Sequence, residues 1–301
     1  MQYKRKLKYQ TPPICGEDVT AIQTQLAKAG FTEAGTVDGV FSINTDVAVR
    51  AFQQSVCLDV DGVVGPLTWS MLFGEPKTEQ ILDKIKPVID KLKIPHAYKD
   101  SVVWCLTDKG VVIGVNNPET SGGEPITVRK VWQQFGTFIE IWSDKFGVPA
   151  ELIMATICTE TSGDPKAVRE EPGYESDDKT PAKISAGLMQ TLISTARSAL
   201  GDDSINRSWL LEPVNSIRAG AAYIASQWKE TEFDPPKVAC AYNAGGVYYN
   251  GSLENRWKMK QYPINSSAHA DRFIKWFNDC FLVFDKESAC PNFSFYKLLK
   301  G

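Results

Sequence analysis

The stretch "PAELIMATICTETSGDP", residues 149–165, predicts a helix that carries Glu160 in its last turn. Ile153 and Ile157 lie one turn apart on such a helix, and Glu160 continues close to the same row. A glycine and a proline follow directly, which is typical of a helix end. If the row of isoleucines is buried, Glu160 lies at the margin of a hydrophobic core.

A carboxylate in that position has an unfavourable environment for its charge. Burial disfavours the charged form, and the negative end of the helix dipole disfavours it further. Both effects raise the pKa of Glu160, to roughly 6–7, which suits proton donation near neutral pH. The alternative for this segment alone is a solvated glutamate at a frayed helix end.

The composition of the whole chain is typical of a globular protein with two domains. Of its 301 residues, 43% are hydrophobic and 23% are charged. The formal net charge of -3 gives no basic field for nucleic acid. Charges interrupt the apolar stretches, so we expect no membrane span. The cationic start, "MQYKRKLKYQTPPICGEDV", has no apolar region after it, so we expect no secretory signal peptide.

The cysteines and histidines indicate neither a metal site nor a cofactor. The chain has seven cysteines with no CxxC pair, and two histidines. A zinc site of the usual kind is therefore not expected. Thiols made in a cytoplasm are expected to be reduced, although Cys280 and Cys290 could close a C-terminal loop, and the sequence leaves that pairing open.

After an extension of residues 1–16, residues 17–73 predict a small unit of three helices. Two segments repeat the order Val-Asp-Gly-Val, loop, Thr, apolar helix: "TVDGVFSINTDVAVRAFQQ" and "DVDGVVGPLTWSMLF". Asp-Gly favours a tight turn with positive φ, and the proline suits a first helical turn. The expected core consists of Leu26, Phe31, Val49, Phe52, Trp69 and Leu72.

This unit resembles the peptidoglycan-binding domain found at one end of many cell-wall hydrolases. The resemblance rests on a Gln-rich first helix, "DGVF", "AVRAFQ" and "VDGVVGPLTWSML", which together cover nearly all of the unit. "FSINT" departs from the family, in which Phe-Gly commonly precedes the Thr. A generic helical adaptor is the alternative interpretation.

The rest of the chain predicts a connector, residues 74–125, and a mostly α domain, residues 126–301. In the connector, Pro87 and Pro95 limit helix length, and two β-rich runs around Asp108-Lys109-Gly110 indicate a hairpin. The fold class is therefore mainly α. The candidate helices of the last domain are "TVRKVWQQFGTFIEIWSDKFG", "PAELIMATICTET", "LISTARSALG", "EPVNSIRAGAAYIASQWKE", "PPKVACAYNAG" and "AHADRFIKWFNDCFLVF".

Two further motifs follow "ETSGDP" in order along the chain: "SAGLMQT", residues 185–191, and "ACAYNAGG", residues 239–246. Together the three motifs resemble the lytic transglycosylase domain of the soluble-lytic-transglycosylase type, which has a lysozyme-like fold. The helix "NSIRAGAAYIASQW" also resembles that family. The resemblance covers roughly residues 126–280.

The resemblance implies a role for six residues. Glu160 is the catalytic acid and base, and Ser162 hydrogen-bonds the substrate or the carboxyl group. Met189 and Gln190 line the sugar groove. Tyr242 places its hydroxyl near Glu160, and Asn243 braces the loop or touches the glycan. For Met189 a place in the core, and for Tyr242 a buried structural role, are the alternatives.

The family reaction needs one carboxylate, whereas ordinary glycosidases use two. Glu160 protonates the oxygen of the β-1,4 bond between N-acetylmuramic acid and N-acetylglucosamine. The muramoyl 6-hydroxyl then attacks its own anomeric carbon and leaves a 1,6-anhydro sugar. A hydrolytic muramidase is the alternative if Asp177 or Asp178, in the insertion "REEPGYESDDKTPAKI", reaches the cleft and activates water. "REEPGY" itself resembles a stretch of phage and goose-type lysozyme relatives.

The remaining expectations concern partners and place of action. The expected partner is the glycan strand of peptidoglycan, bound by a monomer without nucleic acid or metal. A wall-binding protein with an inactive catalytic domain is the other class considered. Without a signal peptide, the layout fits a phage endolysin made in the cytoplasm that reaches the wall after release. A virion lysin and a secreted effector remain open. The end of the domain, "AHADRFIKWF", departs from many relatives and leaves His269 and Arg272 without an assigned role.

Overall fold

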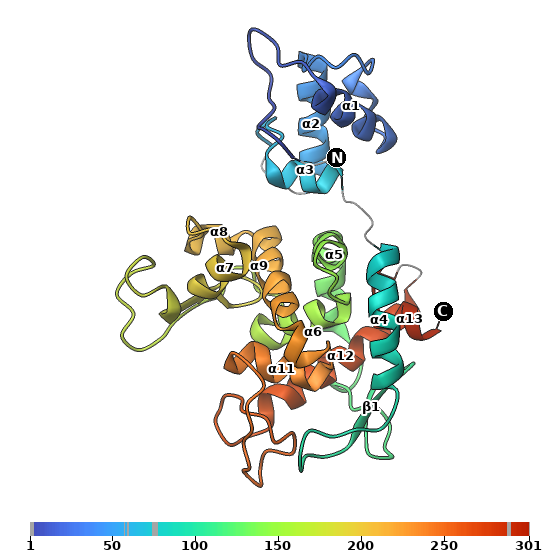
Figure 1. Cartoon of the computed structure of the whole chain (residues 1–301), viewed down its shortest axis with the longest axis vertical. Helices are drawn as coiled ribbons and strands as arrows, with labels where there is room; N and C mark the ends of the chain where they lie inside the picture. The colour runs from blue at the N-terminus through green and yellow to red at the C-terminus, as the bar shows by residue number, and fades with distance from the viewer. Residues whose placement is uncertain (1–2, 57, 59, 74–77, 288–289, 301) are drawn as a thin grey trace. The chain divides into compact units, whose positions relative to one another are not determined.

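The computed structural model describes residues 3–56, 58, 60–73, 78–287 and 290–300, and the chain forms two compact units, Met1–Glu75 and Pro76–Gly301. The fold is mainly α, as predicted, with two small sheets (Figure 1). The first unit contains α1 (Glu17–Lys28), a short 3₁₀ turn (Thr32–Ala34), α2 (Ile43–Ser55) and α3 (Pro66–Leu72). The helices of the second unit are α4 (Thr78–Leu92), α5 (Ile126–Phe146), α6 (Ala150–Thr161), α7 (Ile193–Leu200), α8 (Arg207–Leu211), α9 (Pro213–Ser226), α10 (Trp228–Thr231), α11 (Pro235–Ala244), α12 (Ala268–Lys286) and α13 (Phe295–Lys300).

The core of the first unit consists of the expected apolar residues. Leu26, Val49, Phe52, Trp69 and Leu72 are buried, and Phe31 packs against them while partly exposed. Leu7, from the N-terminal extension, joins this core and exchanges two backbone hydrogen bonds with Val64. The extension is therefore part of the unit.

A buried glutamine holds each of the two Asp-Gly turns. The side chain of Gln23 donates to Asp38 Oδ1 at 2.8 Å and accepts from the backbone N–H of Gly39 at 2.9 Å. Gln53 repeats the arrangement in the second copy, with Asp61 at 2.8 Å and the N–H of Gly62 at 2.9 Å. The sequence repeat is thus a structural repeat, in which a helix presents one amide to the turn that follows it.

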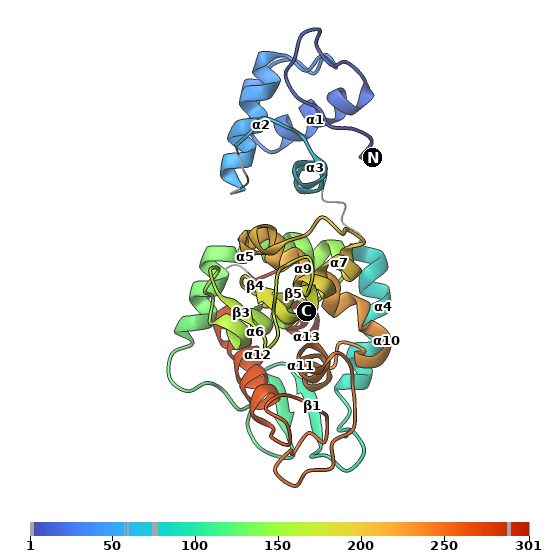
Figure 2. The same cartoon turned by 90° about the vertical axis from the view of Figure 1, so that its left-hand side faces the viewer.

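Helix α6, which contains the segment that opens the sequence, lies in the middle of the second unit. Helices α5, α9, α11 and α12 all contact it (Figures 1 and 2). All residues from Ala150 to Thr159 are buried. A helix that is buried all round needs no polar face, which explains why the segment is apolar on every side and not along one row.

The predicted hairpin is confirmed, and the connector belongs to the second unit. Strands β1 (Trp104–Thr107) and β2 (Gly110–Ile113) pair antiparallel, with Trp104 opposite Ile113. The Asn278 side chain of α12 accepts from the N–H of Val111 at 2.7 Å and donates to its carbonyl at 3.0 Å. The expectation for Pro87 was wrong, because α4 continues through this residue, whose side chain is exposed.

A second sheet, absent from the prediction, follows α6. Strands β3 (Val168–Glu170), β4 (Ile184–Ala186) and β5 (Thr191–Leu192) form it in that order, antiparallel, with a 3₁₀ turn at Pro181–Lys183. These strands have two or three residues each, which is too short to leave an alternating pattern in the sequence. Figure 2 views this sheet from the front, and Figure 1 shows the yellow-green loop between β3 and β4 projecting from the helical body.

The described cysteines are all free, so the open question about Cys280 and Cys290 is answered: they do not pair. Cys158, Cys240 and Cys280 are buried among apolar side chains, and Cys57 lies outside the described residues. Within the described ranges, no helix is both long enough and apolar enough for a membrane span.

Candidate active site

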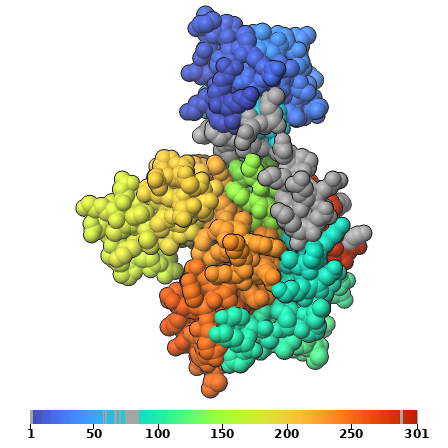
Figure 3. All heavy atoms as spheres, viewed as in Figure 1, coloured from blue at the N-terminus to red at the C-terminus, as the bar shows by residue number. Residues whose placement is uncertain are grey.

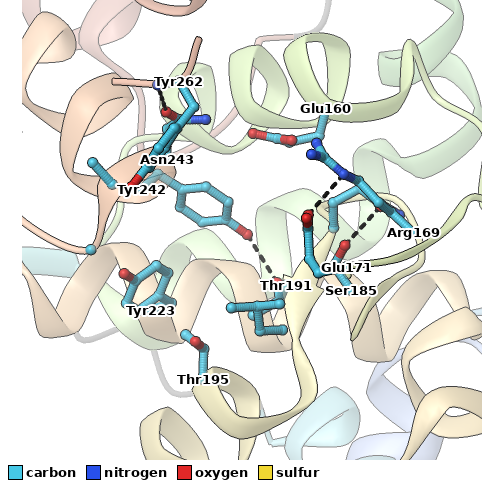
Figure 4. Close-up of a pocket in the computed structure, with 14 residues that line it drawn as sticks. Glu160, Arg169, Glu171, Ser185, Thr191, Thr195, Tyr223, Tyr242, Asn243 and Tyr262 are labelled. Carbon is cyan, nitrogen blue, oxygen red and sulfur yellow. Dashed lines mark hydrogen bonds and ion pairs between the residues drawn. The ribbon is translucent and has the colours of Figure 1, made fainter. Parts of the chain in front are cut away.

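A pocket of about 400 Å³ opens on the second unit, between the sheet segment and the end of α11. Four of the six expected site residues line it: Glu160, Gln190, Tyr242 and Asn243. In Figure 3 the sheet segment (yellow-green to yellow) forms a lobe beside the orange segment, and both segments contribute residues to the pocket wall. Figure 4 shows Glu160 pointing from α6 into the space between Arg169 and Tyr242.

The end of α6 explains how Glu160 reaches the pocket. Ser162 adopts a left-handed conformation with φ 55°, and Gly163 follows with φ 91°. The hydroxyl of Thr161 donates to the carbonyl of Leu188 at 2.8 Å, which ties the helix end to the "GLMQ" turn. The helix thus ends one residue after Glu160 and leaves the side chain of Glu160 20% exposed at the pocket wall.

Burial determines the charge state of Glu160. Removal from water raises its pKa to about 7, and the positive charges of Arg272 and Arg169 partly oppose that rise. No described residue donates a hydrogen bond to the carboxyl group, so no local donor fixes the charged form. A substantial fraction of the molecules therefore carries a protonated Glu160 at neutral pH, as expected from the sequence.

His269, on α12, is the basic side chain nearest to Glu160 and had no role in the prediction. Its Nε2 lies 3.8 Å from Glu160 Oε1. Burial first, and then the charge of Arg272, lowers the pKa of His269 to about 4. The ring is therefore neutral near pH 7, and the contact is not an ion pair.

The tautomer of His269 follows from its other neighbour. Asn243 Oδ1 accepts from the backbone N–H of Tyr262 at 2.5 Å, so Asn243 Nδ2 is the atom that faces His269 Nδ1, at 3.3 Å. An amide nitrogen can only donate, so Nδ1 accepts and the ring proton sits on Nε2. Asn243 thus directs an N–H of His269 toward Glu160 and braces the loop at Tyr262.

Tyr242, on α11, faces the pocket, and its hydroxyl group makes two hydrogen bonds. The hydroxyl donates to the Met189 carbonyl at 2.9 Å, so the Thr191 hydroxyl, also at 2.9 Å, donates to it. Burial raises the pKa of Tyr242 well above its usual range, and the nearby Glu160 adds to this rise. Tyr242 therefore stays neutral. Its ring packs against that of Tyr223, with a centroid distance of 5.2 Å.

Gln190 lines the pocket, but its amide group braces the turn. Its Nε2 donates to the carbonyls of Ala167 and Gly187 at 2.9 and 3.0 Å, and its Oε1 accepts from Ser185 at 3.0 Å. The residue has a φ of 47°, and the side-chain bonds hold this left-handed backbone. The structure thus places Gln190 as a support of the pocket wall.

Met189 does not line the pocket and takes the alternative place in the core, whereas Ser162 lies beside Glu160 as expected, outside the pocket lining. Met189 is fully buried, and a Cβ at Gly220 of α9 would lie 2.3 Å from its sulfur. Its side chain therefore fills the space left by a glycine in the core, and only its carbonyl contributes to the site. Ser162 is exposed beside Glu160, and no described residue bonds its hydroxyl.

The two aspartates of the insertion also lie away from the pocket. Asp177 accepts from the Tyr174 hydroxyl at 2.7 Å and pairs with Arg207 at 3.0 Å. Bonds from Tyr174 and Arg207 lower its pKa despite burial. Asp178 is 92% exposed and pairs with Arg197 at 3.4 Å. Asp177 thus ties the projecting loop to Arg207, and Asp178 lies on its solvated surface.

The second carboxylate in the pocket is Glu171, which sequence reasoning missed as a site residue. It comes from "REEPGY" and lines the pocket together with Arg169, whose Nε lies 2.8 Å from its Oε1 (Figure 4). The resemblance of "REEPGY" to lysozyme relatives was the signal that could have found both. Thr191 and Tyr223, also in the pocket wall, belong to the motif "SAGLMQT" and the helix "NSIRAGAAYIASQW" but were not singled out, and Tyr262 lies outside the motifs.

A metal site has no support among the described residues, where no group of three His, Cys, Asp or Glu side chains could hold an ion. Carboxyl, tyrosine, amide and guanidinium groups around one pocket are suited to binding a polyhydroxylated ligand and to transferring one proton.

Two known families match the chain, one in each of its two structural units. Residues 15–72 match the family described as "Putative peptidoglycan binding domain", and residues 137–264 match the "Transglycosylase SLT domain". The chain thus contains two modules, an N-terminal region that matches a peptidoglycan-binding domain and a later region that matches a transglycosylase SLT domain. Both resemblances noted in the sequence are confirmed.

Individual relatives match over short stretches. A spore cortex-lytic enzyme of Bacillus cereus is 43% identical over 65 residues, which is 22% of this chain and 25% of the relative. The N-acetylmuramoyl-L-alanine amidase CwlM of Mycobacterium tuberculosis is 38% identical over 61 residues, 20% of this chain and 15% of the relative. The chain therefore spans a quarter or less of the length of these curated relatives.

Two solved structures resemble the chain weakly. An inactive mutant of the lytic transglycosylase Slt of Pseudomonas aeruginosa has a TM-score of 0.36 and 13% identity, covering 94% of this chain and 54% of that one. A Burkholderia AP3 phage endolysin has a TM-score of 0.23 and 16% identity, covering 92% and 99%. Neither score establishes a shared fold over the whole chain.

Proposed function

We propose that this protein cleaves the glycan strands of peptidoglycan at the bond between N-acetylmuramic acid and N-acetylglucosamine, with Glu160 as its single acid and base. The observation that carries the proposal is the carboxyl group of Glu160, which faces the pocket with a pKa raised to about 7. An acid with this pKa holds its proton near neutrality and releases it readily to a leaving oxygen. The match of residues 137–264 to the transglycosylase SLT domain supports the same reaction class.

The reaction proceeds in two proton transfers. Glu160 gives its proton to the glycosidic oxygen, the C1–O bond breaks, and the N-acetylglucosamine end leaves as an alcohol. The muramoyl 6-hydroxyl then forms a bond to C1 and loses its proton to the Glu160 carboxylate, which yields a 1,6-anhydro product and restores the acid. Because the nucleophile belongs to the same sugar, no positioned water is required.

The surroundings of Glu160 suit both transfers. Burial favours the protonated form before the first step, while the positive charges of Arg169 and Arg272 favour the carboxylate that this step produces. The N–H on Nε2 of His269 points toward the same carboxylate and adds to that stabilisation. A pKa balanced in this way allows one group to act as acid and then as base.

The N-terminal domain would hold the enzyme on its polymeric substrate, because a second site on the same polymer raises the local concentration of glycan at the pocket. We propose that a monomer acts on the wall without nucleic acid, metal or other cofactor. The modular order of the two domains supports an endolysin that is made in a cytoplasm and reaches the wall after release. Ser162, exposed beside Glu160, would contact the bound sugar.

A hydrolytic muramidase remains the second candidate, and Glu171 is the observation that favours it. Glu171 is the carboxylate that shares the pocket with Glu160, which Asp177 and Asp178 do not. An inverting or retaining glycosidase needs such a second carboxylate to activate water or to attack the sugar. In this chain Glu171 pairs with Arg169, which disfavours its use as a free base.

The products of digestion separate the two candidates. Purified sacculi are digested with wild type, with Glu160→Gln and with Glu171→Gln, and the muropeptides are weighed by mass spectrometry. We expect anhydromuropeptides from wild type and from Glu171→Gln, and none from Glu160→Gln. Reducing-end muropeptides that disappear in Glu171→Gln would establish the muramidase instead.

A further inference from the structure

Exposed tyrosines and a lysine continue the surface of the pocket. Tyr262 lines the pocket and is 52% exposed, and Tyr248 nearby is 53% exposed. The ammonium group of Lys260 lies between them, 5.4 Å from the ring centroid of Tyr262 and 5.9 Å from that of Tyr248. We call these three residues the Tyr248–Lys260–Tyr262 strip.

The backbone places the strip on one face of the loop after α11. The N–H of Lys260 donates to the carbonyl of Tyr248 at 2.7 Å, and Tyr249 forms an antiparallel bridge with Met259. Side chains alternate between faces along such a ladder, so Lys260 and Tyr262 share the face of Tyr248. Met259 and Gln261, on the opposite face, are fully buried. The strip therefore lies on the solvent side of this short ladder, whose opposite face is held in the core by Met259 and Gln261.

Neighbouring groups hold the strip in place. The N–H of Tyr262 donates to Asn243 in the pocket wall at 2.5 Å. The ring of Tyr248 covers Gly246, where an added Cβ would lie 3.0 Å from the ring. The N–H of Val247 donates to Glu230 at 3.1 Å. A bound chain that leaves the pocket past Tyr262 therefore meets a fixed aromatic surface.

The chemistry of the strip fits a charged sugar polymer. A tyrosine ring presents an apolar face beside a polar hydroxyl group, which suits the C–H side of a sugar ring and its hydroxyl groups. The ammonium group of Lys260 forms no ion pair with any carboxylate in the described parts of the chain, whereas Lys91 and Lys286 each pair with a glutamate. A bound neutral sugar alone gives this charge no partner, but a peptide stem on muramic acid carries carboxylates.

We propose that the Tyr248–Lys260–Tyr262 strip binds the peptide-substituted glycan strand beyond the pocket, with Tyr248 against a sugar ring and Lys260 on a carboxylate of the peptide stem. This inference rests on the proposed function, because it takes peptidoglycan as the substrate. It makes Lys260 a determinant of preference for stem-bearing strands, distinct from the groups around Glu160 that act on the bond.

The test compares intact sacculi with glycan strands from which an amidase has removed the stems and whose freed lactyl carboxylates have been converted to methylamides, so that the strand is neutral. An exposed ion pair contributes about 0.6–1 kcal/mol, so we expect Lys260→Met to raise KM about threefold to fivefold on sacculi and to leave it unchanged on stem-free strands. The difference should vanish at high salt. We expect Tyr248→Ala to raise KM on both substrates alike.

Lys99→Met is the matched control. Lys99 also lies over a tyrosine, 4.3 Å from the ring centroid of Tyr249, but this tyrosine is on the other face of the ladder. We expect wild-type KM on both substrates from this variant. An equal effect of Lys260→Met on both substrates, or none on either, would overturn the proposal about the strip. Wild type that cleaves neither substrate would instead overturn the proposed function.

Discussion

Helix α6 carries a glutamate at each end, fully buried at its start and partly exposed at its end, and the pKa of both is raised although their surroundings differ. Burial raises the pKa of both Glu151 and Glu160 to about 7. Glu151, in the first turn, is fully buried and accepts from the backbone N–H groups of Phe295 and Tyr296 at 3.0 and 2.8 Å. Glu160, in the last turn, has no such donor in the described structure and faces the pocket.

The difference shows that a raised pKa alone does not identify a catalytic residue. Glu151 fixes the start of α13 to the start of α6, so its oxygens are fully used by the fold. Glu160 has free oxygens, an opening to solvent and cationic neighbours that favour its charged form. Free hydrogen-bonding capacity at a pocket distinguishes the carboxyl group that we propose as catalytic from the structural one.

The largest effect we expect is the loss of catalysis when Glu160 becomes glutamine. Glu160→Gln keeps the shape of the side chain but removes the proton donor, so the rate should fall by about a thousandfold or more. Turbidity loss of isolated walls measures the rate, and circular dichroism shows whether the fold is kept. A folded variant that still clears walls would contradict the assignment.

The variant Glu151→Ala tests the same comparison at the glutamate that begins α6. This change leaves two buried backbone N–H groups without acceptors, so we expect a loss of about 3 kcal/mol in unfolding free energy. Urea denaturation measures it. The activity of the folded fraction should stay near wild type, because Glu151 lies at the far end of α6. A selective loss of activity without destabilisation would show that Glu151 acts in the reaction.

The pH dependence of stability sharpens the comparison further. The native pKa of Glu160 is about 7, against 4.5 for the ordinary group, so the native state binds this proton more tightly than the unfolded state. Its contribution to stability therefore falls as pH rises from 4.5 to 7 and stays low above 7.

Glu160→Gln should thus match wild type below pH 4.5 and exceed its stability above pH 7, by up to about 3 kcal/mol. Thermal unfolding at a series of pH values measures the difference, and Glu171→Gln serves as a control at the same pocket. A difference that shrinks with rising pH would mean that the folded state stabilises the carboxylate.

The smallest effect concerns His269, which we expect to act through Glu160. His269→Phe keeps a ring but removes the N–H that points toward the carboxylate, so the rate should fall by no more than about tenfold. The basic limb of the pH–rate profile should move to higher pH, because the carboxylate loses a stabilising dipole. An unchanged limb with a lowered rate would indicate a structural role alone.

Much of the fold could be predicted from the sequence, because its signals are local. The long helices follow from apolar periodicity, and the hairpin from a tight turn between β-rich runs. The strands β3 to β5 could not be found, since each has three residues or fewer. The continuation of α4 through Pro87 also contradicts the local rule.

The sequence predicted those site residues that belong to a recognised motif. Glu160, Tyr242 and Asn243 lie there as expected, although their roles remain proposals. Met189 could not be placed, because its position depends on Gly220, which is distant in sequence and leaves room for the sulfur in the core. His269 reaches the site from the start of α12, where no local pattern indicates the contact, whereas "REEPGY" was a local signal for Glu171.

The most direct test of the central claim is the titration of Glu160 itself. Carbon-13 NMR of labelled glutamate side chains follows each carboxyl group with pH, and Glu160→Gln and Glu151→Gln identify the two buried signals. We expect the Glu160 signal to titrate near pH 7 and the protein to lose activity as that group loses its proton. Titration near 4.5, or activity that persists after Glu160 is fully ionised, would contradict a catalytic acid at this position.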